Sequence, residues 1–193
     1  MARVLIPLAD GFEELEAVTV IDLLRRARIT VDVAGLAEGP VTGSRKTVVM
    51  PDISLDHALS QDYDMMVLPG GLPGATHLDE DPRIHQLLHN LTERGKYTAA
   101  ICAAPKVLAH AGLLNGKRVT CFPGTLDNEQ DKNINIDNSG AVVRDGQVIT
   151  SRGPGTTIDF ALELIALLTN THTSAQVEEG LKRPPAHLVH HNP

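Results

Sequence analysis

The sequence predicts an α/β fold, in which a mostly parallel sheet carries helices on both of its faces. Three observations support this prediction. Short apolar runs alternate along the chain with longer segments of helical pattern. The runs at 4–8 and 65–68 are continuously apolar, as in parallel strands that are covered on both faces. A single hairpin pattern at 141–150 adds the antiparallel part of the sheet.

The first third of the chain reads as strand, helix and strand. Residues 4–8 are the first strand, and a turn at 9–11 leads into a helix over 12–28. Arg25 and Arg26 stand near the end of this helix, where cations suit the negative end of the helix dipole. Residues 29–36 are the second strand.

The middle of the chain continues the alternation. A short strand at 47–50 stops at Pro51, and the strand at 65–68 ends in a Pro-Gly-Gly turn. A helix over 82–94 opens with a proline and closes at a glycine, which are the usual signals for the two ends of a helix. A further strand runs up to Cys102.

The last third is expected to begin with a strand at 117–122 and a polar, Asn-rich loop at 127–139. Two strand-like runs then surround Asp145-Gly146, a sequence typical of a two-residue hairpin turn. A helix that opens at Gly153 and runs to Leu168 follows, and a last short helix is expected at 174–181.

Length and composition indicate one globular domain. The chain has 193 residues and a mass of 20.7 kDa, and 42% of its residues are hydrophobic. We expect a single domain over 1–183 and a mobile tail at 184–193, which holds His187, His190 and His191. A net charge of -7 and an aromatic content of 3% argue against nucleic-acid or anionic-membrane partners.

The cysteine count and the lack of long apolar runs favour a cytoplasmic protein. Cys102 and Cys121 are the only cysteines and cannot form a disulfide framework. No secretory signal and no run of about 20 apolar residues is present. His85 and His89 share a helix face but lack the glutamate of a zinc-protease motif, so we expect no metal site. We expect Cys121 to be a core residue.

Cys102 stands where a strand turns sharply into a helix. Small apolar residues precede it, and Pro105 suits the first turn of the helix that follows. Such a turn can lift a nucleophile out of a sheet, and the N–H groups of the helix start favour the thiolate form. A small buried hydrophobic residue is the alternative interpretation of this cysteine.

Glu16 is a carboxylate on the apolar side of its helix. The apolar stripe of the helix at 12–28 contains Ala17, Val20 and Leu24, and Glu16 falls in or beside it. Burial would raise the pKa of this carboxyl, so that it could donate a hydrogen bond to a thiolate or act as a general acid or base. A purely structural buried carboxyl is the other possibility. The ends of parallel strands converge, so Glu16 and Cys102 could meet there.

The loop at 69–74 could complete a site at the same edge of the sheet. Gly70 and Gly71 can form an ordinary turn, or their N–H groups could join that of Ala103 in an oxyanion hole.

Four motifs in this order resemble the ThiJ/PfpI superfamily, and more narrowly its branch with Parkinson disease protein 7 and YajL. They are DGFEELEAV at 10–18, VLPGG at 67–71, AICAAP at 100–105 and TSRGPGT at 150–156. The match runs from Arg3 to about Leu181.

The resemblance implies a flavodoxin-like three-layer sandwich, like that of class I glutamine amidotransferases, and a homodimer. It implies that Cys102 is a reactive, peroxide-sensitive thiol, that Glu16 is its protonated partner, and that Gly71 and Ala103 form the oxyanion pocket. Arg45 matches a position near this pocket, and Arg26 matches one that approaches it from the second subunit.

The activity that the resemblance implies is that of a cofactor-free glyoxalase or protein deglycase. The substrates would be methylglyoxal and glyoxal, or their early adducts. A peroxide-sensing redox chaperone or stress-response protein without significant turnover is the alternative. Ala103 replaces the histidine of protease-like members, which argues against peptidase action. Phe122 stands where Parkinson disease protein 7 has a histidine and where YajL also has a phenylalanine. Without a histidine base, proton transfer would fall to Glu16 or water.

Overall fold

A seven-stranded sheet forms the middle layer of the computed structural model, which describes residues 1–129 and 133–183. The tail at 184–193 and its three histidines lie outside the described residues. All neighbouring strands are parallel except β10 and β11, which form the hairpin. In sheet order the strands are β10 (Val142–Asp145), β11 (Val148–Ser151), β7 (Tyr97–Ile101), β6 (Met65–Leu68), β1 (Arg3–Leu8), β2 (Thr30–Gly35) and β5 (Ile53–Ser54).

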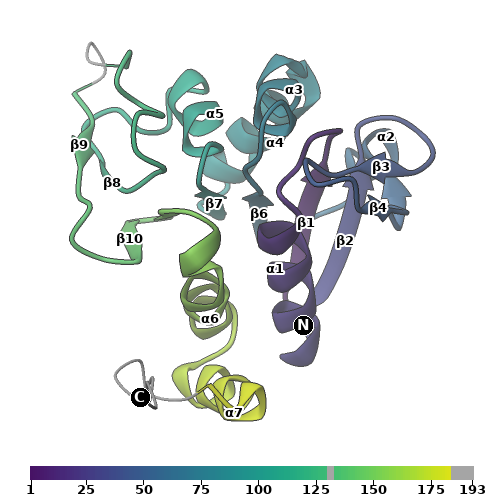
Figure 1. Cartoon of the computed structure of the whole chain (residues 1–193), viewed down its shortest axis with the longest axis vertical. Coiled ribbons are helices and arrows are strands. Elements are labelled where there is room, and N and C mark those ends of the chain that lie inside the picture. Colours follow the sequence, from purple (N-terminus) through teal and green to yellow (C-terminus); the bar gives the residue numbers. More distant parts are fainter. Residues whose placement is uncertain (130–132, 184–193) are drawn as a thin grey trace, which may run out of the picture.

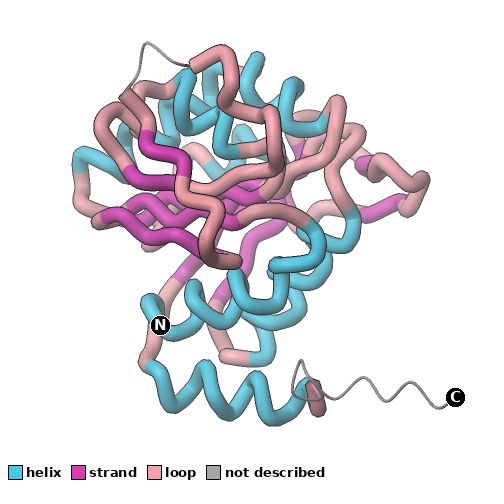
Figure 2. Tube along the Cα trace, turned by 60° about the vertical axis from the view of Figure 1, so that its left-hand side comes forward, coloured by secondary structure: helices cyan, strands magenta, loops and turns pink. Residues whose placement is uncertain are grey.

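Helices cover both faces of this sheet, which confirms the predicted three-layer fold (Figures 1 and 2). One face carries α1 (Glu14–Arg26), α6 (Thr157–Leu168) and α7 (Thr171–Leu181). The other carries α2 (Leu55–Ala58), α3 (Gly74–Glu80), α4 (Pro82–Glu93) and α5 (Pro105–His110). A short 3-10 turn, η2 (Pro154–Thr156), leads into α6.

Strand β1 shows how the sequence supplies both cores. Its side chains alternate between the two faces of the sheet, because successive residues of a strand point in opposite directions. Val4, Ile6 and Leu8 join the core under α1 and α6, while Leu5 joins the core under the other helices. All four are at most 1% exposed, so the run is continuously apolar although its residues serve two separate cores.

Two predicted strands are much shorter and lie outside the main sheet. The run at 47–50 contributes only β4 (Val48–Val49), which pairs with β3 (Val41–Thr42). The run at 117–122 contributes only β8 (Arg118–Val119), which pairs with β9 (Asn135–Ile136). Beyond β8 the chain bonds elsewhere: the Thr120 N–H donates to the Thr150 hydroxyl at 2.9 Å.

The other boundaries differ in small ways. Helix α1 begins at Glu14 because Phe12 lies in a turn, where its N–H donates to the Ala9 carbonyl. The hairpin is confirmed, but its turn is Gly146–Gln147, one residue later than predicted. Gly146 adopts a φ of +64°, which glycine tolerates best. The sequence did not predict α2, α3, β3, β5 or β9, and β9 lies within the segment at 127–139 that was predicted to be a loop.

None of the helices in 1–129 and 133–183 has the length and apolar character needed to cross a bilayer. Within the same residues, no group of three or more His, Cys, Asp or Glu side chains could hold a metal ion.

Candidate active site

Three loops meet at the carboxyl ends of β1, β6 and β7, which are neighbours in the sheet. The first leads into α1 and carries Glu16 one turn inside the helix. The second holds Gly70 and Gly71, and the third holds Cys102. Residues that are far apart in the sequence therefore share one edge of the sheet, where α/β proteins usually bind ligands.

Cys102 is held in a strained turn between β7 and α5. Its φ is +63°, a left-handed value that costs a residue with a side chain about 1 kcal/mol or more. Hydrogen bonds on both sides keep it there. Its N–H donates to the Ser151 carbonyl at 3.0 Å, and its carbonyl accepts the N–H of Phe122 at 2.9 Å. The side chain is half-buried, so small molecules can reach the sulfur.

Glu16 is a fully buried carboxyl next to this thiol. It is 0% exposed, and its Oε2 accepts the N–H of Gly70 at 2.8 Å. No N–H or O–H group in the described parts of the chain donates to its Oε1. The Cys102 thiol is the remaining hydrogen-bonding group that the carboxyl faces, and the interaction changes the pKa of both groups.

Burial dominates the electrostatics of the pair. It raises the pKa of Glu16 from 4.5 to about 7, against the opposing effects of the Gly70 N–H and the Cys102 side chain. Burial also raises the pKa of Cys102, followed by the negative charge of Glu16 and the hydrogen bond between the two groups. The N–H groups of Ala103 and Gly71 act in the opposite direction, because they stabilise the thiolate.

The two groups are therefore best described as sharing a proton. The sequence predicts that the start of the helix favours the thiolate form of Cys102, but burial and an ionised Glu16 both oppose ionisation of the thiol. When the proton sits on Glu16, the repulsive charge disappears and the carboxylic acid becomes a hydrogen-bond donor to sulfur. Ionisation of Cys102 thus depends on transfer of its proton to Glu16, and a carboxyl with a pKa of about 7 is suited to that transfer.

Gly70 and Gly71 allow the close approach of these groups. A Cβ on Gly70 would lie 2.7 Å from the Cβ of Cys102 and 2.8 Å from the Glu16 carboxylate. Gly71 has a φ of +90°, and a Cβ there would lie 2.4 Å from the Glu13 nitrogen. Since the Gly70 N–H is bound to Glu16, the expectation that it joins an oxyanion hole is wrong. Gly71 and Ala103 are the residues that direct N–H groups at the sulfur.

The thiol opens into a cavity of about 640 Å³. Its polar lining residues include Glu13, Ser44 and Arg45, so Arg45 borders the cavity, near which the family resemblance implies it should lie. Its large apolar lining residues are Leu72 and Phe122. The complete lining is Glu13, Ser44, Arg45, Gly71, Leu72, Cys102, Ala103, Phe122, Pro123, Gly124, Thr125 and Pro154.

Hydrogen bonds to the acidic residues Glu13 and Glu14 connect the polar lining residues Ser44 and Arg45 to the start of α1. The sequence did not predict these roles. The Glu14 carboxylate accepts the N–H groups of Arg45 at 2.6 Å and Thr47 at 3.2 Å. The Ser44 hydroxyl lies 3.1 Å from carboxylate oxygens of both Glu13 and Glu14. A run of acids in a first helical turn is common for dipole reasons, so nothing in the sequence separated these roles.

Comparison with known proteins places this fold and site in a family. The sequence profile of the DJ-1/PfpI family matches residues 2–167. The chain belongs to the DJ-1/PfpI family. The crystal structure of Drosophila melanogaster DJ-1beta superposes with a TM-score of 0.90 at 39% identity, over 95% of this chain and 99% of that one.

Two DJ-1 relatives show how far the similarity extends. A Parkinson disease protein 7 homolog from Danio rerio is 43% identical over 181 residues, which cover 93% of this chain and 96% of the relative. A protein from Caenorhabditis elegans named glutathione-independent glyoxalase DJR-1.2 is 35% identical over 167 residues, or 86% and 88% of the two chains. The family thus includes a member named for enzymatic activity.

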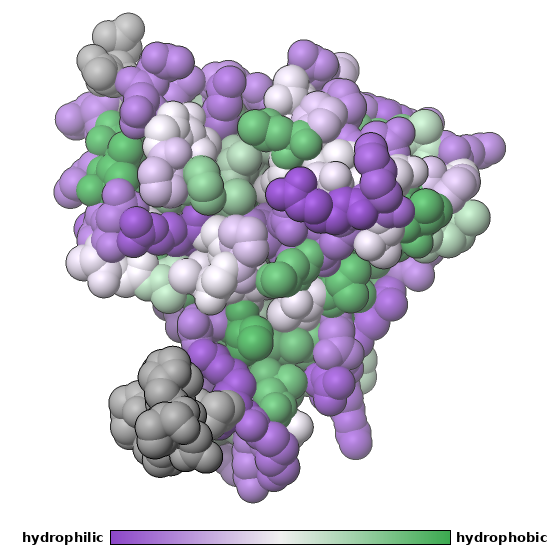
Figure 3. Space-filling model, in the orientation of Figure 1, coloured by the Kyte–Doolittle hydropathy of each residue, from purple (hydrophilic) through white to green (hydrophobic). Residues whose placement is uncertain are grey.

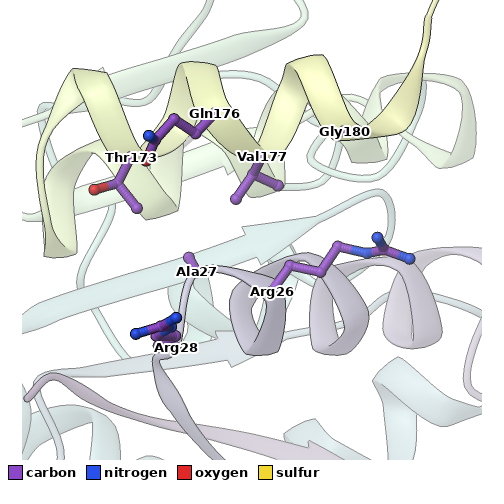
Figure 4. A pocket seen from close by; sticks show the side chains of 7 residues that line it. All are labelled: Arg26, Ala27, Arg28, Thr173, Gln176, Val177 and Gly180. Carbon is purple, nitrogen blue, oxygen red and sulfur yellow. The ribbon is translucent and has the colours of Figure 1, made fainter.

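Within this DJ-1 family chain, Arg26 lies away from the Cys102 cavity. It stands at the end of α1, ten residues and thus about 15 Å of helix from Glu16. Its guanidinium pairs with Asp22 at 2.7 Å. It borders a separate groove of about 680 Å³ between the end of α1 and α7, opposite Gln176 and Val177 (Figure 4). Its expected approach from a second subunit stays a prediction.

The sequence did not predict a cluster of polar side chains around His110. His110 ends α5, and its ring nitrogens lie 2.5 Å from the Asp79 carboxylate and 2.9 Å from that of Glu129. His85, which shares a helix face with His89, contacts the Asp79 carbonyl at 2.8 Å. These residues join α3, α4, α5 and the loop after Phe122. Cys121 is 3% exposed, as expected of a core residue.

Proposed function

We propose that the chain is a cysteine-dependent glyoxalase that works without glutathione and also acts on early glycation adducts. The observation that carries this proposal is the pairing of the Cys102 thiol with a buried carboxyl of raised pKa at the bottom of an open cavity. A nucleophile, a proton acceptor and two N–H donors are the groups needed to add a thiol to an aldehyde.

The first step is formation of a hemithioacetal. The Cys102 sulfur attacks the aldehyde carbon of methylglyoxal while its proton passes to the Glu16 carboxylate. The carbonyl π bond breaks, and the oxygen becomes an alkoxide that the N–H groups of Gly71 and Ala103 can stabilise. The alkoxide then takes the proton back from Glu16, so the adduct is neutral.

The second step moves a proton between the two carbons. Glu16 removes the C–H proton of the former aldehyde carbon, which gives an enediolate with its negative charge on the former ketone oxygen. That oxygen takes the proton of the neighbouring hydroxyl. Glu16 then returns its proton to the former ketone carbon, the C–O⁻ of the other carbon becomes a carbonyl, and the product is a thioester of lactate. Water hydrolyses the thioester, which releases lactate and restores the thiol. The sequence consumes one water and needs no oxidant.

Lactate formation from methylglyoxal in the absence of glutathione tests this proposal. Cys102→Ser is expected to lose at least about a thousandfold in kcat/KM, because near neutral pH a hydroxyl is a far weaker nucleophile than a thiol. Cys121→Ser is the matched control for loss of a thiol. Turnover by Cys102→Ser at the wild-type rate would contradict the assignment.

The same chemistry extends to early adducts on side chains. An aldehyde that has added to an amine or guanidine forms a carbinol, which releases the aldehyde to the thiol, and the amine leaves as the intact side chain. The open mouth of the cavity supports such substrates. Recovery of free arginine from a freshly prepared methylglyoxal adduct, faster with wild type than with Cys102→Ser, is the expected result.

A peroxide sensor is the second candidate function, favoured by the N–H groups of Gly71 and Ala103 that face the sulfur. The thiolate attacks one peroxide oxygen and releases water, which gives sulfenic acid, and a second peroxide gives sulfinic acid. These N–H groups could bind the sulfinate oxygens. Selective oxidation of Cys102 seen by mass spectrometry, without turnover of any dicarbonyl, would favour sensing; equal oxidation of Cys102 and Cys121 would contradict it.

We also propose that the protein is a homodimer that uses α1 and the β3–β4 hairpin. Leu15 and Val18 on α1 are 52% and 46% exposed, and Val48 and Met50 are 60% and 68% exposed. In Figure 3, which has the orientation of Figure 1, apolar surface is visible in the region of α1. Light scattering is expected to give twice the monomer mass, and Val18→Asp to give the monomer.

A further inference from the structure

Two large apolar side chains stand at the mouth of the Cys102 cavity. Leu72 is 67% exposed and Phe122 is 50% exposed, and both line the cavity. Single exposed apolar residues are common on protein surfaces. Here two of them border the same opening, together with Pro123 and Pro154. This gives the mouth an apolar rim, which we define as Leu72 and Phe122.

The rim is rigidly tied to the reacting groups. Leu72 directly follows Gly71, whose N–H faces the sulfur. The Phe122 N–H donates to the carbonyl of Cys102 at 2.9 Å, so the residue is fixed to the strained turn itself. The ring of Phe122 lies beside Gly153, since a Cβ on that glycine would be 3.5 Å from Cδ2 of the ring. The backbone of both rim residues is therefore held close to the thiol, and the Phe122 ring also packs beside Gly153.

The rest of the cavity lining includes the polar residues Glu13, Ser44 and Arg45. A reacting carbonyl must lie between the sulfur and the N–H groups of Gly71 and Ala103, which leaves its substituent to contact other lining residues. Among these, the rim is the part that can hold a large apolar substituent. The cavity of about 640 Å³ is also in the range that holds drug-sized ligands, far larger than methylglyoxal requires.

We propose that Leu72 and Phe122 make the site selective for α-oxoaldehydes that carry a bulky apolar group, with an aryl group as the best fit. This inference rests on the proposed function, because it assigns the substrate class of the same thiol. An aryl substituent would cover both rim side chains and could meet the Phe122 ring edge to face. Methylglyoxal offers only a methyl group to the rim and gains little from it.

The kinetic test compares phenylglyoxal with methylglyoxal. The ratio of their kcat/KM values is expected to favour phenylglyoxal in the wild type, and to fall about fivefold or more in Leu72→Ser and in Phe122→Ser. Phe122→Leu keeps an apolar side chain and is expected to retain part of the preference. Leu59→Ser is the matched control, because Leu59 is 37% exposed but lies at the end of α2, outside this cavity.

A chemical test separates this inference from the proposed function. Alkylation of Cys102 by iodoacetamide and by its N-benzyl derivative, followed by intact mass, needs the thiol but no turnover. The benzyl reagent is expected to react relatively faster with wild type than with Leu72→Ser or Phe122→Ser, by about fivefold. If no oxoaldehyde is turned over but this ratio holds, the glyoxalase proposal fails and the rim assignment stands. Equal ratios in wild type and both variants would overturn the rim assignment.

Discussion

Glu13, Glu14 and Glu16 are the same kind of residue within one helical turn, yet each has different surroundings. Glu13 borders the cavity, Glu14 accepts the N–H groups of Arg45 and Thr47, and Glu16 is buried against the thiol. Hydrogen bonds lower the pKa of Glu14, despite a contribution from burial that raises it, whereas burial raises that of Glu16. Environment rather than residue type decides which of them can accept a proton near neutral pH.

Glu16 should make the stability of the protein depend on pH. Between pH 4.5 and about 7 the folded chain keeps a proton on Glu16 that the unfolded chain releases, so the free energy of unfolding falls as pH rises. The full difference amounts to about 3 kcal/mol. Urea unfolding of wild type and Glu16→Gln at pH 4.5, 6 and 7.5 should show this fall in the wild type and a smaller one in the variant. Parallel pH profiles would contradict the raised pKa.

The same proton should control the rate. Below pH 7 both Glu16 and Cys102 are protonated, and no group can accept the thiol proton. The kcat/KM for methylglyoxal is therefore expected to rise about tenfold per pH unit from pH 5 and to level off near 7. Glu16→Gln should lose about a hundredfold or more and show no inflection there. A wild-type profile that is flat from pH 5 to 8 would argue against Glu16 as the proton acceptor.

Gly70 offers a test of the geometry. In Gly70→Ala the new methyl group would lie 2.7 Å from the Cβ of Cys102, so the thiol and Glu16 must move apart. We expect a loss of about 2 kcal/mol in unfolding free energy and a marked loss of turnover. Gly155→Ala is the control, because its methyl would meet nothing within 4 Å. Equal stability of the two variants in urea would show that the site relaxes easily.

At the scale of elements, other parts of the chain hold the loops of the site in place. Strand β11 supplies the Ser151 carbonyl that binds Cys102, and the loop after β8 supplies the Phe122 N–H. The His110 cluster joins α5, which follows Cys102, to α3, which follows the Gly70–Gly71 loop. The helices on both sides of the thiol are therefore linked by a side-chain contact as well as by the sheet.

Removal of this link should destabilise the chain. His110→Ala deprives the Asp79 carboxylate, whose side chain is 16% exposed, of its contact with the imidazole. We expect a cost of about 1–2 kcal/mol in unfolding free energy, measured in urea. His89→Ala is the control, since His89 is exposed on the same layer of helices. A His110→Ala variant as stable as His89→Ala would show that the cluster contributes nothing measurable.

Short elements are also where sequence-based prediction failed. The longer strands and helices follow from apolar periodicity, because burial on one or both faces sets that pattern. Helix α3 and strands β3, β5 and β9 are too short to show a period. The run at 117–122 looks like a core strand, yet its N–H groups bond to the Thr150 side chain and to Cys102 instead of a sheet neighbour. Only the folded arrangement supplies those partners.

At the scale of the whole molecule, two apolar cores share one sheet. Leu24 on α1 and Leu88 on α4 are each 0% exposed, one in each core. If residues 1–183 fold as one domain, Leu24→Ala and Leu88→Ala should each cost about 2–5 kcal/mol and shift a single transition. Circular dichroism and thiol exposure of Cys102 should then report the same urea midpoint. Separate midpoints would indicate that the two layers unfold independently.

The general plan of the site was visible in the sequence, whereas its detail was not. The strand-to-helix turn at Cys102 and the carboxyl of Glu16 on an apolar helix face both carry local signals. The use of the Gly70 N–H by Glu16, the roles of Glu13 and Glu14, and the rim formed by Leu72 and Phe122 depend on contacts between distant segments. No periodicity or spacing records such contacts.

Cys102 directly follows β7, and Glu16 lies in the helix that follows β1, which has a consequence for how the protein folds. These strands are separated by β6, so the thiol and its proton acceptor meet only after all three have paired. A nascent or partly folded chain carries an ordinary cysteine, with the sluggish reactivity of a free thiol. The reactive thiol therefore forms late in folding, and chains that do not reach the native state do not acquire its reactivity.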